Sequence, residues 1–216
     1  MKRIFQLLLL VAATAPIACS GCDDSANIKT EALSNYADIV LASYEDTLTT
    51  GKALDAAIKT LVTSPSQANL DAAKKAWLLA REPYLQTEVY RFYEGPIDNA
   101  KNGPEGLLNA WPLDENYIDY TADSPGAGLI NDKAFKITAA NIENANEAGG
   151  EKNVATGYHA IEFLLWGQDT SDTGPGARPY TDYVTDGTGT AANQERRGQF
   201  LSLCGDLLVT HLTMIR

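Results

Sequence analysis

The chain has 216 residues, which is enough for one domain with a well-formed core or for two small ones. Hydrophobic residues make up 44% and charged residues 21%, which argues against wholesale disorder. The net charge is −11 and no basic cluster is present, so we expect no nucleic-acid partner and no attraction to anionic lipid headgroups. Only two histidines occur, His159 and His211, so a site that needs two histidines must use both.

Residues 1–22 have the features of an export signal. Lys2 and Arg3 form a positive segment, and the apolar run that follows has the length of a signal peptide rather than of a membrane span. A small residue precedes both Cys19 and Cys22, which resembles a bacterial lipoprotein signal whose cysteine is lipidated. We therefore expect a protein of the bacterial cell envelope, periplasmic or on the surface, held to the membrane by a lipid anchor only. Plain secretion is the alternative.

Residues 23–216 contain the predicted helical domain. Apolar residues recur at intervals of three and four through 28–62 and predict a long amphipathic helix, in which Gly51 is a candidate interruption. A second helix is predicted over 67–93. Pro83 lies inside it and is expected to kink it or to leave a carbonyl unpaired.

Two long irregular segments are expected in the rest of the chain, at 94–128 and 167–192. Both are rich in turn-forming residues, and connections this long are usually functional. Within the first, two stretches predict short helical turns, 104–111 and 113–120. The remaining predicted helices are 131–145, 154–166 and 192–216.

The pattern as a whole predicts an all-α fold, a bundle of about four main helices with long irregular connections, because β-branched alternation is almost absent. Cys204 lies in an apolar helical run and is expected to be a buried, inert thiol. The chain stops within its last predicted helix without a cap, which predicts a truncated chain or a fragment that lacks a partner half.

A first polar cluster lies in the predicted helix that ends at Gly167. His159 and Glu162 are three residues apart and share one helical face. The helix is otherwise apolar nearly all round, so we expect it to be buried and Glu162 to be paired, protonated or ligating. A His/Glu pair at this spacing can hold a metal ion if further ligands come from elsewhere. The alternatives are a structural His–Glu hydrogen bond and a pairing of Glu162 with an arginine.

A second polar cluster forms one stripe along the predicted helix 67–93. Its members are Arg81, Tyr84, Glu88 and Arg91, at intervals of three, four and three residues. The two arginines can flank Glu88 and keep it ionised, which suits an anion-stabilising network or a ligand carboxylate. The alternatives are a solvated face and a buried ladder of ion pairs.

The chain resembles the imelysin-like family of bacterial envelope proteins. The pattern GxHxxE is matched by Gly157, His159 and Glu162. Members of that family look like two related helical bundles in a chain of roughly double this length, and this chain resembles their first half. Four segments carry the resemblance: AREPYLQTEVYRFYEGPID (80–98), NAWPLDENYIDY (109–120), GYHAIEFLLWGQD (157–169) and ERRGQFL (195–201).

The resemblance implies a set of site residues but assigns no catalytic residue. It implies that His159 and Glu162 are metal ligands and that Glu88 is a third ligand from a facing helix. The residues expected to form a supporting polar network are Arg81, Tyr84, Arg91 and Asp169.

Two activities are associated with the family, an insulin-cleaving metallopeptidase and an iron-regulated envelope protein of iron uptake. A carboxylate-rich site with one imidazole suits iron or another hard-to-borderline cation, and a zinc hydrolase would also need a general base that we do not find. We therefore expect a lipoprotein associated with iron uptake that binds a metal ion or small ligand and meets iron-transport partner proteins. The alternatives are a zinc-dependent peptidase and a non-catalytic surface module that recognises its partner through the loops 94–128 and 167–192.

Overall fold

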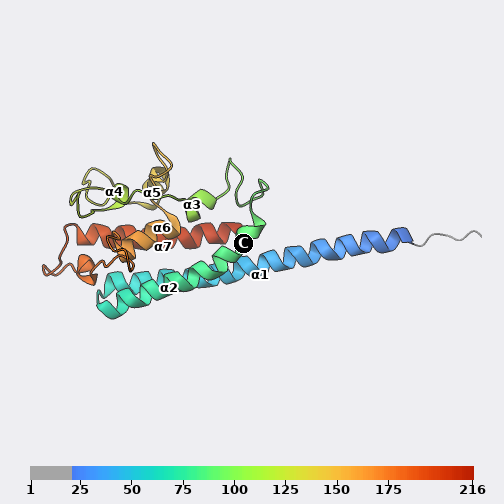
Figure 1. Ribbon diagram of the computed structural model, residues 1–216, viewed down its shortest axis with the longest axis horizontal. Helices are drawn as coiled ribbons and strands as arrows, with labels where there is room; N and C mark the ends of the chain where they lie inside the picture. The colour runs from blue at the N-terminus through green and yellow to red at the C-terminus, as the bar shows by residue number, and fades with distance from the viewer. Residues whose placement is uncertain (1–20) are drawn as a thin grey trace, which may run out of the picture. The chain divides into compact units, whose positions relative to one another are not determined.

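The fold is all-α, as the sequence predicts (Figure 1). In this computed structural model the backbone is described for residues 21–216 and the side chains from residue 25 onward. Residues 1–20 of the expected signal, with Cys19, lie outside the described residues, and of Cys22 only the backbone is described. Between residues 21 and 216 the backbone forms no β-strand beyond one isolated bridge, Thr121 to Ser124.

Four longer helices form the bundle and three short helices lie in its connections. The long ones are α1 (Gly21–Thr63), α2 (Gln67–Gln86), α6 (Gly157–Trp166) and α7 (Gln194–Ile215). The short ones are α3 (Glu105–Asn109), α4 (Glu115–Ile118) and α5 (Ala139–Ala145). The chain also forms two 3-10 turns, η1 (Thr87–Tyr90) and η2 (Tyr180–Tyr183).

The chain divides into two compact units, residues 1–38 and 39–216. The described part of the first unit is helical and its side chains are exposed. The second unit contains the hydrophobic core, which gathers side chains from the rest of α1 and from α2 to α7. The site and the contacts discussed below lie in the second unit.

The helix α1 continues through Gly51 without the interruption considered above. A Cβ at Gly51 would lie 2.6 Å from the Leu212 side chain, and one at Gly205 would lie 2.7 Å from Asp55 Oδ1. These contacts show that α1 and α7 run antiparallel and very close together. Gly51 therefore serves close helix packing rather than a break.

The second helix ends earlier than predicted. α2 stops at Gln86, and the chain tightens into the 3-10 turn η1 instead of continuing to residue 93. The Thr87 hydroxyl donates a hydrogen bond to the Tyr84 carbonyl over 2.6 Å, and the Thr87 N–H donates to the same carbonyl. Pro83 lies within the last turn of α2. These contacts satisfy a carbonyl at the helix end and direct the chain out of the helix.

The predicted helix 131–145 is also shorter than expected, because only Ala139–Ala145 is helical. Thr138 caps it, its side chain accepting a hydrogen bond from the Asn141 N–H over 3.2 Å. Upstream, Asp132 Oδ1 accepts a hydrogen bond from the Ala134 N–H over 2.8 Å, which favours a turn. Local side-chain bonds therefore outweigh the helical spacing before Thr138.

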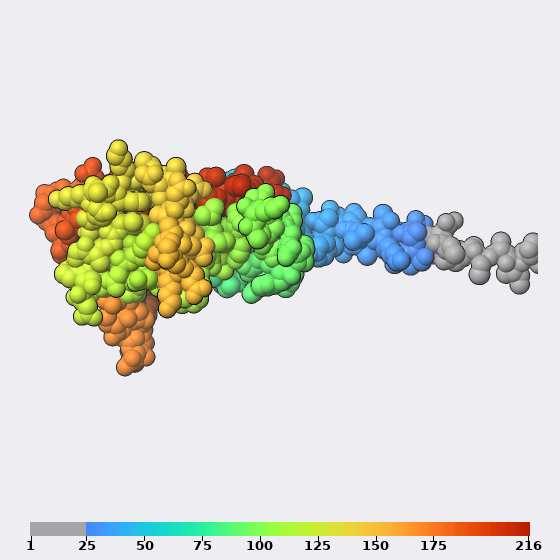
Figure 2. Space-filling model, turned by 90° about the horizontal axis from the view of Figure 1, so that it is seen from above, coloured from blue at the N-terminus to red at the C-terminus, as the bar shows by residue number. Residues whose placement is uncertain are grey.

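The central helix α6 is buried on nearly every side, as predicted, and packs against α2, α3 and α7. On the outside of this unit, the segments between α2 and α6 cover one face, and part of the loop that follows α6 projects from the surface (Figure 2). Both long loops therefore lie next to α6, and both contribute to the cleft described next.

Candidate functional site: an acidic, tryptophan-lined cleft

Gly157 determines how α6 begins. Its backbone φ is +78°, a left-handed conformation that side chains disfavour. A Cβ at this position would lie 2.3 Å from the Leu108 carbonyl oxygen of α3. Glycine is therefore required both for the backbone conformation and for the close approach of α3, and it sets the position of His159 two residues later.

His159 and Glu162 form the pair that the spacing predicts. The Nδ1 atom of His159 lies 2.9 Å from Glu162 Oε2. The side chain of His159 is 16% exposed and that of Glu162 is 39% exposed, so the pair is partly accessible to solvent. The imidazole also packs against the Trp111 ring, with 4.8 Å between ring centroids.

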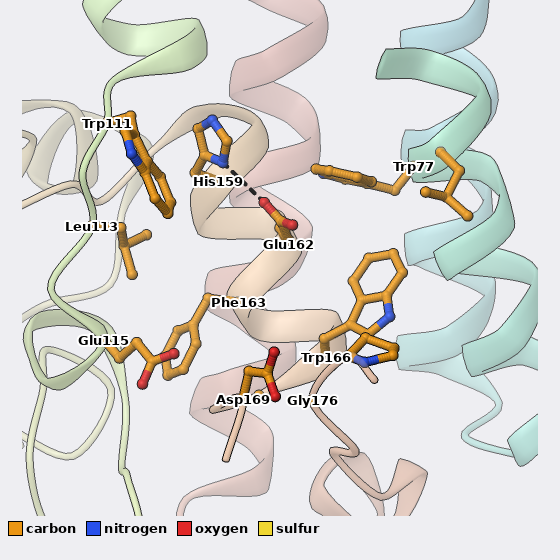
Figure 3. A pocket seen from close by; sticks show the side chains of 13 residues that line it. Trp77, Trp111, Leu113, Glu115, His159, Glu162, Phe163, Trp166, Asp169 and Gly176 are labelled. Carbon is orange, nitrogen blue, oxygen red and sulfur yellow. Dashed lines mark hydrogen bonds and ion pairs between the residues drawn. The ribbon is translucent and has the colours of Figure 1, made fainter. Parts of the chain in front are cut away.

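The pair lies at one end of a cleft of about 470 Å³ (Figure 3). All three tryptophans of the chain line it: Trp77 from α2, Trp111 from the loop after α3, and Trp166 from the end of α6. Trp77 and Trp166 meet edge to face, with 5.3 Å between centroids. The Trp77 indole N–H donates a hydrogen bond to the Tyr158 carbonyl over 2.8 Å, which ties α2 to α6.

Three carboxylates face this cleft, those of Glu115, Glu162 and Asp169. Glu115 and Asp169 lie near Phe163 in Figure 3, away from His159. Burial raises the pKa of Glu115, and the neighbouring Asp169 charge raises it further, although the Asp169 backbone N–H donates a hydrogen bond to Glu115. The residues that line the cleft include no lysine or arginine among those described. The cleft therefore combines aromatic walls with excess negative charge.

The structure does not assemble the three metal ligands that the resemblance implies. Glu88 lies on η1, its side chain is 57% exposed, and Arg91 is 4.0 Å away. It is not among the residues that line the cleft. Among the residues that the structure describes, no three His, Cys, Asp or Glu side chains form a cluster that could hold a metal ion. Because α2 ends at Gln86, Glu88 does not continue the helical stripe that spacing predicts.

The expected supporting residues divide into two places. Asp169 lines the cleft, whereas Arg81, Tyr84 and Arg91 form a separate network around Glu105 of α3. Tyr84 donates a hydrogen bond to Glu105, and Arg91 forms an ion pair with the same carboxylate. Burial raises the pKa of Tyr84, and the Glu105 charge adds to this effect. Glu105 therefore takes the central position that the sequence stripe assigns to Glu88.

Arg81 connects that network to the base of α6. Its Nη1 atom donates to Asn109 Oδ1 over 2.6 Å, and its guanidinium lies 4.9 Å from the centroid of the Tyr158 ring. Burial lowers the pKa of Arg81, and the nearby charge of Glu162 partly offsets this. Arg81 therefore interacts electrostatically with Glu162, although its side chain does not line the cleft.

The residues that sequence reasoning missed are mainly the walls of the cleft. Trp77, Trp111 and Trp166 lie far apart along the chain, and no periodicity links them. The one signal in the sequence is that tryptophan is rare, because only three occur. In the structure all three line the cleft. Glu115 has a weaker signal, because it lies in one of the two long loops expected to be functional.

Comparisons with known proteins agree with this picture. Residues 40–216 match the model of the imelysin family, peptidase M75. A protein named Iron-regulated protein A from Synechococcus elongatus (strain ATCC 33912 / PCC 7942 / FACHB-805) is 32% identical over 149 residues. Those residues make up 68% of this chain and 35% of that protein, so the chain spans only part of the relative's length. With a family match that covers most of its length, this chain belongs to the imelysin family.

Proposed function

We propose that the chain is an exported, lipid-anchored protein of the bacterial envelope that binds iron through His159 and Glu162 as part of iron uptake. The observation that carries this proposal is the 2.9 Å separation between His159 Nδ1 and Glu162 Oε2. Two donor atoms that each lie about 2.1 Å from a metal ion and subtend about 90° at it are about 3.0 Å apart. The pair is therefore already spaced as a chelate.

The donor set fits a cation site with two protein ligands. One imidazole and one carboxylate suit Fe²⁺ or another borderline cation. The remaining coordination positions would be filled by water, by a small ligand or by a segment of a longer protein, because among the described residues no third His, Cys, Asp or Glu side chain clusters with the pair. Such an incompletely filled site suits a protein that binds and releases iron as cargo.

The surroundings of the pair favour binding as well. The Trp111 ring packs against His159, and Trp77 and Trp166 form the opposite wall of the cleft (Figure 3). Apolar walls exclude water and strengthen the attraction between a cation and the Glu162 carboxylate. Arg81 opposes this attraction, but it is held by Asn109 and by the ring of Tyr158 and does not line the cleft.

The relative supports the iron assignment through its name, which states regulation by iron. Export and lipidation through Cys19 or Cys22 rest on the signal-like segment, and we extend the proposal to iron-transport partner proteins in the same compartment. The family description supports a peptidase as the rival function. A zinc-dependent peptidase would require a third ligand and a general base beyond the two donors placed here.

The test is a metal titration monitored by calorimetry, with Fe²⁺ under anaerobic conditions and Zn²⁺ in parallel. We expect one Fe²⁺ bound per chain. The variant His159→Ala/Glu162→Gln should lose at least about tenfold in affinity, since it removes both proposed donors. His211→Ala is the matched control, because it removes the other histidine, which pairs with Glu143 at 2.8 Å outside the cleft.

Iron affinity that is equal in the wild type and in the double variant would contradict the proposal. Cleavage of a peptide mixture that stops on addition of a chelator, and that requires His159, would favour the peptidase instead.

A further inference from the structure

The cleft is much larger than a metal site requires. A water molecule occupies about 30 Å³, so an ion with two protein donors and about four waters fills roughly 150 Å³. The cleft measures about 470 Å³, which is in the range of pockets that hold small organic molecules. Its lining extends beyond the His159–Glu162 pair to Phe163, Glu115 and Asp169 (Figure 3).

The walls of this remaining space are aromatic. Trp77 and Phe163 are buried, whereas Trp111 is 69% exposed at the edge of the cleft. Indole rings attract cations through their electron-rich faces. The chain itself contains such contacts, since Lys74 Nζ lies 5.5 Å from the Trp166 centroid and the Arg81 guanidinium lies 5.7 Å from the Trp77 centroid.

The charge of this space is negative. Glu115 comes from α4 and Asp169 from the loop after α6, and the two are close enough for the Asp169 charge to raise the pKa of Glu115. Among the described residues, neither forms an ion pair with a lysine or arginine. Arg178 contributes some attraction to Glu115, but it is bound to Asp119 and Asp182. A cationic ligand would relieve the repulsion between the two carboxylates, and an anionic one would increase it.

We propose that the cleft binds an organic cation, an ammonium group on an apolar body, with the ammonium near Glu115 and Asp169 and the apolar body against the tryptophan rings. This site is separate from the proposed iron site at the other end of the cleft and does not depend on it. The specificity comes from two sources: the carboxylates select the positive charge, and the indoles select the apolar body.

The test uses three probes of matched size and different charge: 4-phenylbutylamine, 4-phenylbutan-1-ol and 4-phenylbutyrate. Affinity is measured by tryptophan fluorescence and by calorimetry, with EDTA present so that metal binding does not contribute. We expect the amine to bind at least about tenfold more tightly than the alcohol and the carboxylate to bind most weakly. An amine that binds no more tightly than the alcohol, or that does not bind, would overturn the proposal.

The variant Glu115→Gln/Asp169→Asn locates the site. It should weaken amine binding at least about tenfold and change alcohol binding by less than about twofold. The matched control is Glu151→Gln/Asp172→Asn, which removes the same charge from two exposed positions outside the cleft. An equal loss in the control would show a nonspecific effect of net charge and would overturn the site assignment.

A single substitution tests the same site in case the double variant does not fold. Asp169 is exposed, so Asp169→Asn should keep its helical content and still weaken amine binding by about threefold or more. Unchanged amine affinity in this folded variant would contradict the proposal. Because EDTA is present throughout, neither result changes the iron proposal, which the metal titration decides alone.

Discussion

Two groups of carboxylates lie on neighbouring elements of this molecule, and only one of the groups is neutralised by arginines. Asp119 and Asp182 are fully buried and are paired with two buried arginines. Glu162, Glu115 and Asp169 face a cleft whose described lining contains no arginine or lysine. The first arrangement neutralises its own charge, whereas the second leaves negative charge facing a cavity. The comparison separates carboxylates that stabilise the fold from carboxylates at which we propose ligand binding.

Both carboxylates of the buried group accept several hydrogen bonds. Arg197 forms a bidentate contact with Asp119, at 2.7 Å and 3.0 Å, and Arg178 Nη1 bridges Asp119 and Asp182 at 2.9 Å and 3.0 Å. Tyr120 donates a hydrogen bond to Asp182 over 2.6 Å. This network connects the loop after α4, the turn η2 and the start of α7. Because the two arginines already neutralise these carboxylates, an added cation would gain little by binding to them.

The largest expected effect comes from breaking the buried network. Asp119→Ala removes the carboxylate that both arginines share and leaves two buried positive charges with fewer partners. We expect a loss of about 3–5 kcal/mol in the free energy of unfolding. Urea denaturation followed by circular dichroism measures it. A loss below about 1 kcal/mol would show that the network is not the structural lock described here.

The next largest effect comes from the glycine that positions the cleft histidine. Gly157→Ala places a Cβ against the Leu108 carbonyl at a left-handed backbone position. We expect a loss of about 2–4 kcal/mol in the free energy of unfolding, together with weaker metal binding. Gly174→Ala is the control, because a Cβ there meets nothing within 4 Å. Equal stability of the two variants would contradict the assigned role of Gly157.

The two histidines sharpen the comparison further. His211 is 1% exposed and pairs with Glu143, whereas His159 is partly exposed in the cleft. We expect His211→Ala to lose about 2–3 kcal/mol of stability through a cavity and a lost, partly buried hydrogen bond. His159→Ala should lose less than about 1 kcal/mol. Thermal unfolding of both variants checks the order, and the reverse order would assign the structural role to His159.

The smallest effect concerns Glu115. Burial raises its pKa in the folded state, so the fold favours the protonated form and gains stability from this group as the pH falls toward 4.5, its ordinary pKa. At neutral pH the charged carboxylate is slightly unfavourable to the fold. We therefore expect Glu115→Gln to raise the melting temperature slightly at neutral pH and to have no effect below pH 4.5. A lower melting temperature at neutral pH would indicate an unrecognised favourable partner for the carboxylate.

Much of the helical framework could be predicted from local pattern. The spacing of apolar residues predicts the long helices, and Gly167 marks the end of α6, where its φ is +71°. Cys204 is a buried thiol, as expected, and burial raises its pKa. The errors occur at ends where a side chain bonds to the backbone. Thr87 ends α2 early and Thr138 begins α5 late, and such local bonds are not visible in periodicity.

The candidate site was predicted in part, for a related reason. His159 and Glu162 lie on one helix, so their spacing alone brings them together. Arg91 lies 4.0 Å from Glu88 but pairs more closely with Glu105, a residue of a different helix that only the tertiary fold brings to it. The convergence of the three tryptophans is likewise a property of the fold, since each belongs to a different segment.

Histidine nitrogen NMR tests the central claim most directly, because the chain contains only two imidazoles. Fe²⁺ is added anaerobically in substoichiometric amounts, and its unpaired electrons broaden the signals of the nearest ring. The His211→Ala variant assigns the two spin systems. We predict that the His159 signals broaden first while those of His211 remain sharp. Equal broadening of both rings, earlier broadening of His211, or no effect at equimolar iron would contradict the account.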